Sequence, residues 1–243
     1  FHPEPVVSSK SSFSLAINLA NKGNDVSVLA PFPSRPNTSD YPKKKLRLYY
    51  KDITYSQFTL IRCYSFFSKK SQLVSRFIEN LTFGITSALY VLFSKKTDVI
   101  YANTWPIFAS LLLTCSANIR GIPLILSVQD LYPETLINQG RFSKNNQLVN
   151  NILQKIDKFS LSSSHTCIAI SEGFKTAIIK KGIDRDKISV VYNWNTYSDS
   201  NNEKSQVNFR EIFKLDESAF LVIFAGNISS SAGVKEIINI FSK

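Results

Sequence analysis

Residues 98–134 read DVIYANTWPIFASLLLTCSANIRGIPLILSVQDLYPE, and their pattern indicates the class of fold. The apolar segment 98–101 predicts a short strand, and residues 106–117 have the spacing of a buried helix. Residues 123–128 form a continuous apolar run that is typical of a strand covered on both faces. A strand, a helix and a second strand in this order predict two parallel strands joined by a helical crossover.

The same alternation continues on both sides of this stretch. Strands are predicted at 25–30, 58–64, 166–170 and 188–192, and helices at 73–93, 149–161 and 172–181, after an opening helix that ends near residue 22. Because each parallel crossover needs a helix to return the chain to the same edge, we predict an α/β fold. The expected architecture is a Rossmann-like parallel sheet with helices on both faces.

A second unit is predicted near the C-terminus. Residues 219–243, AFLVIFAGNISSSAGVKEIINIFSK, have the pattern of a buried strand at 220–225, a glycine-containing turn and an amphipathic helix, which is how a Rossmann-like domain begins. We therefore expect a first domain at 1–197, a linker at 198–218 and the start of a second domain at 219–243. The opening FHPEP precedes a helix without a strand before it, so we expect a fragment truncated at both ends.

Composition restricts the possible binding partners and the cellular compartment. The chain has 29 Lys and Arg against 18 Asp and Glu, a net charge of +11, which suits anionic partners. Cys63, Cys115 and Cys167 lie far apart without CxxC spacing, so we expect neither a disulfide framework nor a metal site, and a reducing cytoplasm fits best. No apolar run reaches the roughly 18 residues that a membrane-spanning helix needs.

Polar and aromatic residues follow the predicted strands, where ligands of such sheets bind. Asp130 and Glu134 come directly after a buried strand, and Pro133 restricts the turn between them, so general-base or hydroxyl-binding work is possible there. The alternative is that Asp130 caps a short helix and Glu134 is solvated. Trp105 could stack on a sugar ring or cover the floor of a cleft. The predicted set around one cleft is His2, Glu4, Asn103, Trp105, Gln129, Asp130, Glu134, Asn193 and Asn195.

Five segments in order resemble the bacterial GT-B glycosyltransferases of family 4, especially the branch that builds O-antigen and capsule polysaccharides. They are FHPEP, NKGNDVSVLAPFPSRPN, SVQDLYPETLINQG, SEGFKTAIIKKGIDRDKISVVYNWN and FLVIFAGN. The resemblance implies two facing Rossmann-like domains, an N-terminal one for the acceptor and a C-terminal one for the nucleotide sugar. It also implies a hexosyl- or N-acetylhexosaminyltransferase that retains anomeric configuration, with the nucleotide sugar as co-substrate and no other cofactor. The fragment alone is expected to be inactive.

The resemblance also assigns roles to residues. Gln129 stands where many relatives keep a histidine, and since glutamine cannot act as a base, any charged role falls to Asp130. Asn227 stands where many relatives have a basic residue beside the donor phosphates. The implied catalytic residues are Asp130 and Glu134, the acceptor-binding residues His2, Glu4, Asn103, Trp105 and Gln129, and the donor-binding residues Asn193, Asn195, Gly226 and Asn227.

Basic residues flank the predicted helix at 73–93, in KKKLRLYYK and FFSKKSQLVSRF before it and at Lys95 and Lys96 after it. An anionic membrane is the favoured partner, with a lipid-linked acceptor at the inner face of the plasma membrane, and a solvated basic face is the alternative. No nucleic-acid motif is present, so no nucleic-acid partner is expected. Two further alternatives are a nucleotide-sugar 2-epimerase, which would need histidines in the cleft, and a non-catalytic basic remnant.

Overall fold

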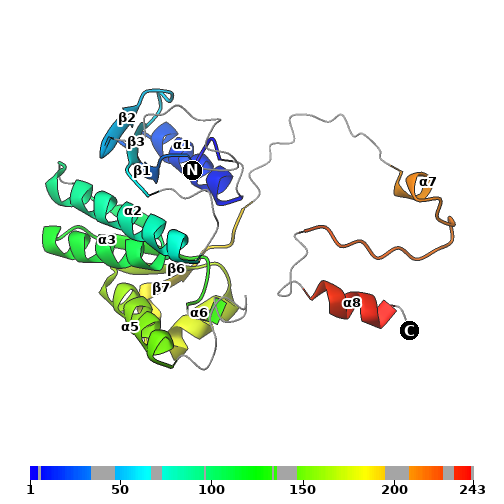
Figure 1. Cartoon of the computed structure of the whole chain (residues 1–243). Helices are drawn as coiled ribbons and strands as arrows, with labels where there is room; N and C mark the ends of the chain where they lie inside the picture. The colour runs from blue at the N-terminus through cyan, green and yellow to red at the C-terminus, as the bar shows by residue number, and fades with distance from the viewer. Residues whose placement is uncertain are drawn as a thin grey trace.

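The computed structural model of the chain is an α/β structure with parallel strands flanked by helices, which confirms the predicted class (Figure 1). It describes residues 1–4, 7–33, 47–66, 73–95, 97–132, 134–135, 147–194, 208–226 and 233–241.

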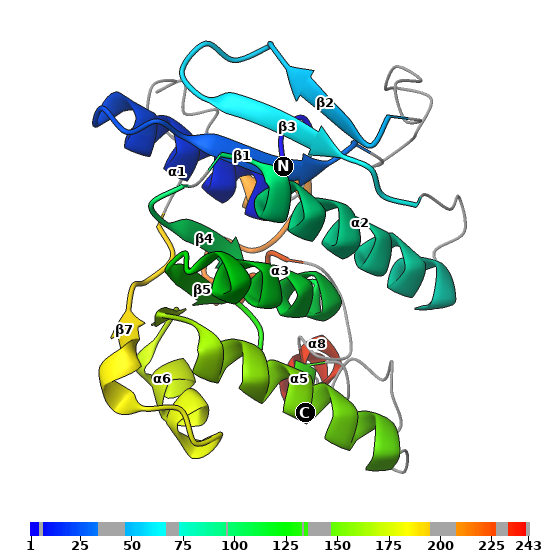
Figure 2. The same ribbon diagram turned by 90° about the vertical axis from the view of Figure 1, so that its left-hand side faces the viewer.

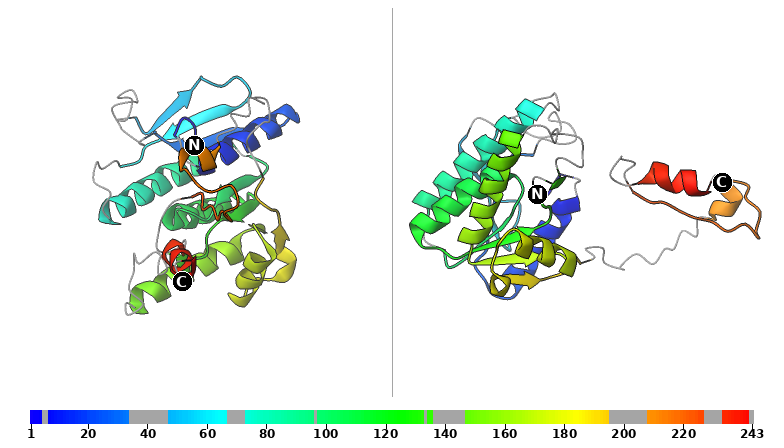
Figure 3. Two further views of the ribbon diagram at one scale, coloured as in Figure 1. Left: turned by 90° about the vertical axis from the view of Figure 1, so that its right-hand side faces the viewer. Right: turned by 90° about the horizontal axis from the view of Figure 1, so that it is seen from below.

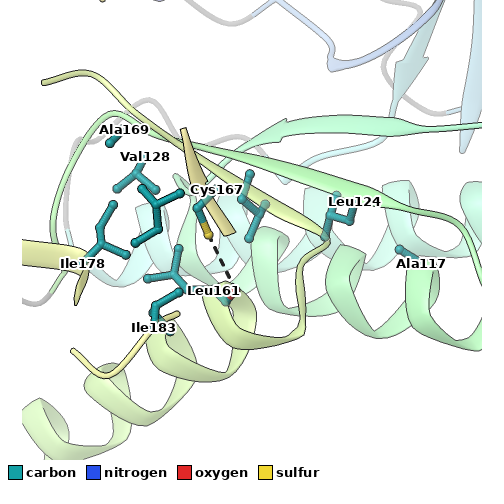
Figure 4. Close-up of a cluster of buried hydrophobic side chains, with 10 residues drawn as sticks. Ala117, Leu124, Val128, Leu161, Cys167, Ala169, Ile178 and Ile183 are labelled. Carbon is teal, nitrogen blue, oxygen red and sulfur yellow. Dashed lines mark hydrogen bonds between the residues drawn. The ribbon is translucent and has the colours of Figure 1, made fainter. Parts of the chain in front are cut away.

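Four parallel strands form the larger sheet, in the order β4-β5-β6-β7. They are β4 (Ile100–Asn103), β5 (Leu124–Val128), β6 (Thr166–Ala169) and β7 (Ile188–Val190), and the connecting helices are α3 (Ile107–Arg120), α5 (Gln147–Ser163) and α6 (Glu172–Lys180), with the short helix η3 (Arg185–Lys187) before β7. Leu124 and Leu126 of β5 are at most 1% exposed because helices cover the central strands. They pack with Leu161, Cys167 and Ile178 in the main core, where the Cys167 thiol donates to the Leu161 carbonyl oxygen (Figure 4).

A separate sheet of three strands has the order β1-β3-β2. β1 (Ser27–Pro31) and β3 (Thr59–Cys63) are parallel, whereas β2 (Tyr49–Asp52) is antiparallel to β3. The four-stranded sheet confirms the predicted parallel sheet, whereas the antiparallel strand β2 and the separation into two sheets were not predicted. The segment YYKD is too short to show strand periodicity, and in the part of the chain that the structure describes no ladder joins β1 to β4.

Helix α2 (Leu73–Phe93) has the predicted bounds and lies beside α3, with α5 next in the same layer (Figure 2). The two helices approach closely at Gly84, where a Cβ atom would lie 2.8 Å from the Cα atom of Ala109. At the end of α2, the guanidinium of Arg120 donates to the carbonyl oxygens of Val91 (3.0 Å) and Ser94 (3.1 Å), which satisfies carbonyls that have no partner within the helix.

Helix α1 (Val7–Asn21) packs on the three-stranded sheet through Ala16 and Phe13. Phe13 lies 5.9 Å from Phe58 and 5.2 Å from Tyr55, ring centroid to ring centroid, both in edge-on geometry. These aromatic contacts fix the loop between β2 and β3 to α1.

Helices α7 (Phe209–Ile212) and α8 (Val234–Phe241) lie away from the two sheets (Figures 1 and 3). The predicted strand at 220–225 was wrong: residues 220–226 form no regular element, and Phe220 is 90% exposed. An apolar run becomes a strand only when a neighbouring strand pairs with it, and no neighbour pairs with it among the described residues. The helix predicted after it is present as α8 (Val234–Phe241), and α7 (Phe209–Ile212) lies within the predicted linker.

Candidate functional site

The carboxyl ends of the parallel strands β4 to β7 carry the candidate site. Asn103 is the last residue of β4, Gln129 and Asp130 follow β5, and Asn193 follows β7. Parallel strands end at the same edge of a sheet, and the sequence of β5 therefore delivers its polar residues to that edge as soon as its apolar run stops.

Two side-chain amides link the ends of β5 and β7. The Gln129 Nε2 amide donates to the Ser127 hydroxyl at 3.0 Å, and the Gln129 Oε1 oxygen accepts from the Asn193 Nδ2 amide at 3.2 Å. Ser127 is 1% exposed and Asn193 is exposed, so the link runs from the interior of the sheet to the solvent. The structure thus brings Gln129 and Asn193 together across the end of β6.

An aromatic pair follows the ends of β4 and β5. The rings of Trp105 and Tyr132 are stacked, with centroids 5.1 Å apart and planes at 19°. Tyr132 is 3% exposed and packs against Ile107 and Leu153, whereas Trp105 is 39% exposed. Trp105 therefore covers Tyr132 and still presents apolar ring surface to the solvent, as a sugar-stacking residue requires.

Asp130 lies between Gln129 and Tyr132 in the sequence. Burial raises the pKa of Asp130 above its ordinary value, and a 3.4 Å hydrogen bond from the Tyr132 hydroxyl to its carboxylate acts in the opposite direction with a smaller effect. A carboxylate with a raised pKa is a stronger base, because the protonated form is favoured there.

Glu134, the second predicted catalytic carboxylate, is exposed and forms an ion pair with Lys181, whose Nζ atom lies 3.3 Å from Glu134 Oε2. Lys181 also donates to the Tyr132 carbonyl oxygen, and its Nζ atom lies 2.7 Å from Asp157 Oδ2. The carboxylate of Glu134 therefore belongs to an ion-pair group at the base of the segment that carries Asp130.

His2 and Glu4 belong to a different group, centred on Arg62 of β3. Arg62 is 3% exposed; its guanidinium donates to the His2 carbonyl oxygen at 2.6 Å and lies 3.5 Å from the carboxylate of Asp52. Burial lowers the pKa of Arg62, and the negative charges of Asp52 and Glu4 oppose that shift. The ring of His2 hydrogen-bonds Tyr55, so this group holds the N-terminal residues against the three-stranded sheet.

The remaining candidates are placed as follows. Gly226 lies in the irregular, exposed segment 220–226, and Asn195 and Asn227 lie outside the described residues. His165 sits at the opposite end of the sheet, where its backbone N–H donates to the Leu124 carbonyl oxygen at the start of β5. Within the described ranges, no three His, Cys, Asp or Glu side chains gather as a metal ion would need. The helices described here include none that is long and apolar enough to cross a bilayer.

Sequence reasoning missed three residues that shape this edge: Tyr132, Asp157 and Lys181. Tyr132 stands inside the SVQDLYPE segment, and an aromatic residue within a few positions of the end of a buried strand was a usable signal. Asp157 and Lys181 lie 24 residues apart on different helical segments, and the sequence has no pattern that pairs them.

A parallel α/β sheet flanked by helices, with amide, carboxylate and aromatic side chains at its carboxyl edge, is the architecture of a Rossmann-like domain. Residues 9–194 match the model of one family, described as Glycosyltransferase Family 4, and the chain belongs to that family.

Two solved structures are similar over part of the chain. Anabaena HepE in complex with UDP matches with a TM-score of 0.34 at 19% identity, covering 46% of this chain and 27% of that one. HepE in complex with UDP-glucose matches with a TM-score of 0.34 at 18% identity, covering 51% of this chain and 29% of HepE. The matched part thus spans less than a third of HepE. A search of curated proteins gives no match.

Proposed function

We propose that the protein is the acceptor-side part of a glycosyltransferase that moves a sugar from a nucleotide-sugar donor to a hydroxyl of a saccharide or lipid-linked saccharide. The observation that carries this proposal is the carboxyl-edge group, in which Asp130, Trp105 and the Gln129–Asn193 amide link come from the ends of three strands. The family match over residues 9–194 supports it.

The chemistry suits these side chains. In sugar transfer, a bond forms between the acceptor oxygen and the anomeric carbon, the bond from that carbon to the donor phosphate breaks, and the acceptor hydroxyl loses a proton. Asp130 supplies a carboxylate that stabilises positive charge on the sugar or accepts the proton. Gln129 and Asn193 offer amide donors and acceptors for sugar hydroxyls, and Trp105 offers a stacking face.

The finer assignment follows the family resemblance. We propose a retaining hexosyl- or N-acetylhexosaminyltransferase of cell-surface polysaccharide synthesis, acting on an O-antigen- or capsule-type acceptor without a cofactor beyond the donor. Asn193, Asn195, Gly226 and Asn227 are the proposed donor-side residues, and His2, Glu4 and Asn103 the further acceptor-side ones.

A membrane location is part of the proposal. Helix α2 exposes apolar side chains along its length: Val74 is 68% exposed, Ile85 43%, Leu89 41% and Phe93 84%. With a net charge of +11, this apolar stripe suits contact with an anionic bilayer surface. The proposed location is cytoplasmic, peripheral at the inner face of the plasma membrane.

The test is direct transfer. The product of the complete reading frame that contains these residues is incubated with isotopically labelled UDP-, GDP- and dTDP-sugars and with lipid-linked mono- and disaccharides, and products are identified by mass spectrometry and NMR. We expect labelled sugar in the acceptor with the anomeric configuration of the donor. Interconversion of two free nucleotide sugars without transfer would favour the epimerase instead, although neither His2, at Tyr55, nor His165, at the opposite end of the sheet, supports that alternative.

A further inference from the structure

The segment that carries Gln129 and Asp130 is anchored by Lys181, which donates a hydrogen bond to the Tyr132 carbonyl oxygen. Lys181 directly follows α6 and precedes Gly182, whose positive φ of 85° turns the chain at that point. Its ammonium group makes three contacts: with the Tyr132 carbonyl oxygen, with Asp157 Oδ2 at 2.7 Å and with Glu134 Oε2 at 3.3 Å. Three acceptors match the three N–H donors of an ammonium group, so its bonding capacity is used completely.

The partner that fixes Lys181 is a buried carboxylate. Asp157 of α5 is 4% exposed, and burial raises its pKa while the charge and hydrogen bond of Lys181 oppose that shift. A buried carboxylate is costly unless it is paired and hydrogen-bonded. Asp157 therefore constrains Lys181 to a single place, and Lys181 in turn constrains the Tyr132 carbonyl.

Tyr132 connects the Lys181–Asp157 pair to the two site residues Trp105 and Asp130. Its carbonyl oxygen is held by Lys181, its ring is stacked on Trp105, and its hydroxyl donates to Asp130. The same helix that supplies Asp157 also supplies Leu153, which packs against the Tyr132 ring. Any movement of the Tyr132 backbone thus displaces both the stacking face and the carboxylate.

We propose that Lys181 is a positioning residue for sugar transfer: through Asp157 and the Tyr132 carbonyl it fixes the segment that carries Asp130 and the face that Trp105 presents. This proposal rests on the proposed function for its catalytic part. Anchoring of this kind matters because a displacement of about 1 Å at a reacting group can lower a rate by roughly 10²-fold.

The test uses a variant without an orphaned buried charge. Lys181→Met alone leaves the Asp157 carboxylate buried without its cation, so the informative protein is Lys181→Met/Asp157→Leu, which replaces the pair by apolar groups. The matched control is Lys187→Met. Lys187 also donates to backbone carbonyls, those of Ser162 (2.9 Å) and Ser164 (3.4 Å), at the end of α5 away from Tyr132.

Two readouts separate anchoring from mere stability. In a Trp194→Phe background Trp105 is the only tryptophan, because the chain has two. We expect acrylamide quenching of Trp105 to rise about twofold or more in the double variant and to stay unchanged in the control, since only the double variant frees Tyr132. In the active enzyme with Trp194 retained, kcat should fall at least about tenfold with the donor KM little changed.

Each result decides something. Unchanged quenching in the folded double variant overturns the proposal, and so does raised quenching with an unchanged kcat. An equal effect of Lys187→Met on both readouts also overturns it, because general loosening would then explain them. If the unaltered enzyme transfers no sugar, the proposed function fails, whereas the quenching result still supports or overturns the anchoring of the segment.

Discussion

Substitution of Gly84 by alanine tests the packing between α2 and α3, on which the relation of the two sheets depends. The new Cβ atom would lie 2.8 Å from Ala109 Cα, 3.2 Å from Ala109 N and 3.2 Å from a Leu112 methyl carbon. Carbon atoms in contact prefer about 3.5–4.0 Å, so the helices must separate by roughly 1 Å. Two of the three obstructing atoms are backbone, which no rotamer change can move.

Two effects compete in this variant. Alanine gains about 1 kcal/mol over glycine in helix propensity, whereas overpacking of a tight contact costs about 1–3 kcal/mol, with backbone clashes at the upper end. We therefore expect a net loss of about 2 kcal/mol in the free energy of unfolding. For a domain of this size, that loss corresponds to a fall of about 4–8 °C in Tm.

The assay is urea and thermal unfolding, with Gly173→Ala as the matched control. Gly173 is also helical, but a Cβ atom there would meet only the Ser171 hydroxyl oxygen, at the ordinary distance of 3.7 Å. The control should gain up to about 1 kcal/mol, because propensity acts alone. The reasoning is refuted if Gly84→Ala is as stable as the unaltered protein while the control behaves as expected.

Three further predictions concern the site and the surface. Asp130→Asn should lower kcat about 10²-fold or more with little change in acceptor affinity, and a kcat within twofold of the unaltered enzyme would return Asp130 to a structural role. The folded-state pKa of Asp130 is raised above 3.8, so the ionised carboxylate opposes folding increasingly as the pH rises from about 4 through that pKa. Over this range Asp130→Asn should therefore become more stable relative to the unaltered protein. Urea unfolding between about pH 3.5 and 7 measures this difference. Val74→Ser/Phe93→Ser should weaken binding of the protein to anionic vesicles at least about tenfold in a sedimentation assay, whereas Leu148→Ser on α5 should not weaken it. Displacement of the protein from the vesicles by nucleic acid at equal phosphate concentration would contradict the proposed membrane contact.

The larger sheet could be predicted because its strands are apolar runs bounded by helical patterns. β5, LILSV, is buried on both faces, and a strand of a parallel sheet with helices on both sides gives that pattern. The bounds of α2 were also predictable, since its apolar spacing persists over the whole helix. β2 was not predictable, because its four residues become a strand only through tertiary contacts such as the hydrogen bond from the Tyr49 hydroxyl to the Thr86 carbonyl oxygen.

The site was predictable in part, for a physical reason. Residues that end neighbouring parallel strands must lie at one edge, and this places Gln129 and Asn193 within 3.2 Å although they are 64 residues apart. The contacts of Lys181 with Tyr132 and Asp157 depend instead on the paths of loops and helix ends. No pattern in the sequence predicts the contact of Lys181 with Tyr132, which is 49 residues away. The apolar run at 220–225 has the local pattern of a strand, but it forms no strand because no described segment pairs with it.

The division between the two sheets has a consequence for how residues 1–243 behave as a separate chain in solution. In the part that the structure describes, β1 pairs with β3 alone and β4 pairs with β5 alone, so each has one edge without a neighbouring strand. Such an edge is a row of main-chain donors and acceptors that can template a foreign strand, the first step of strand exchange and aggregation. The net charge of +11 opposes this step by mutual repulsion. Salt weakens that repulsion without weakening the hydrogen bonds, so we expect a higher ionic strength to favour association of such chains.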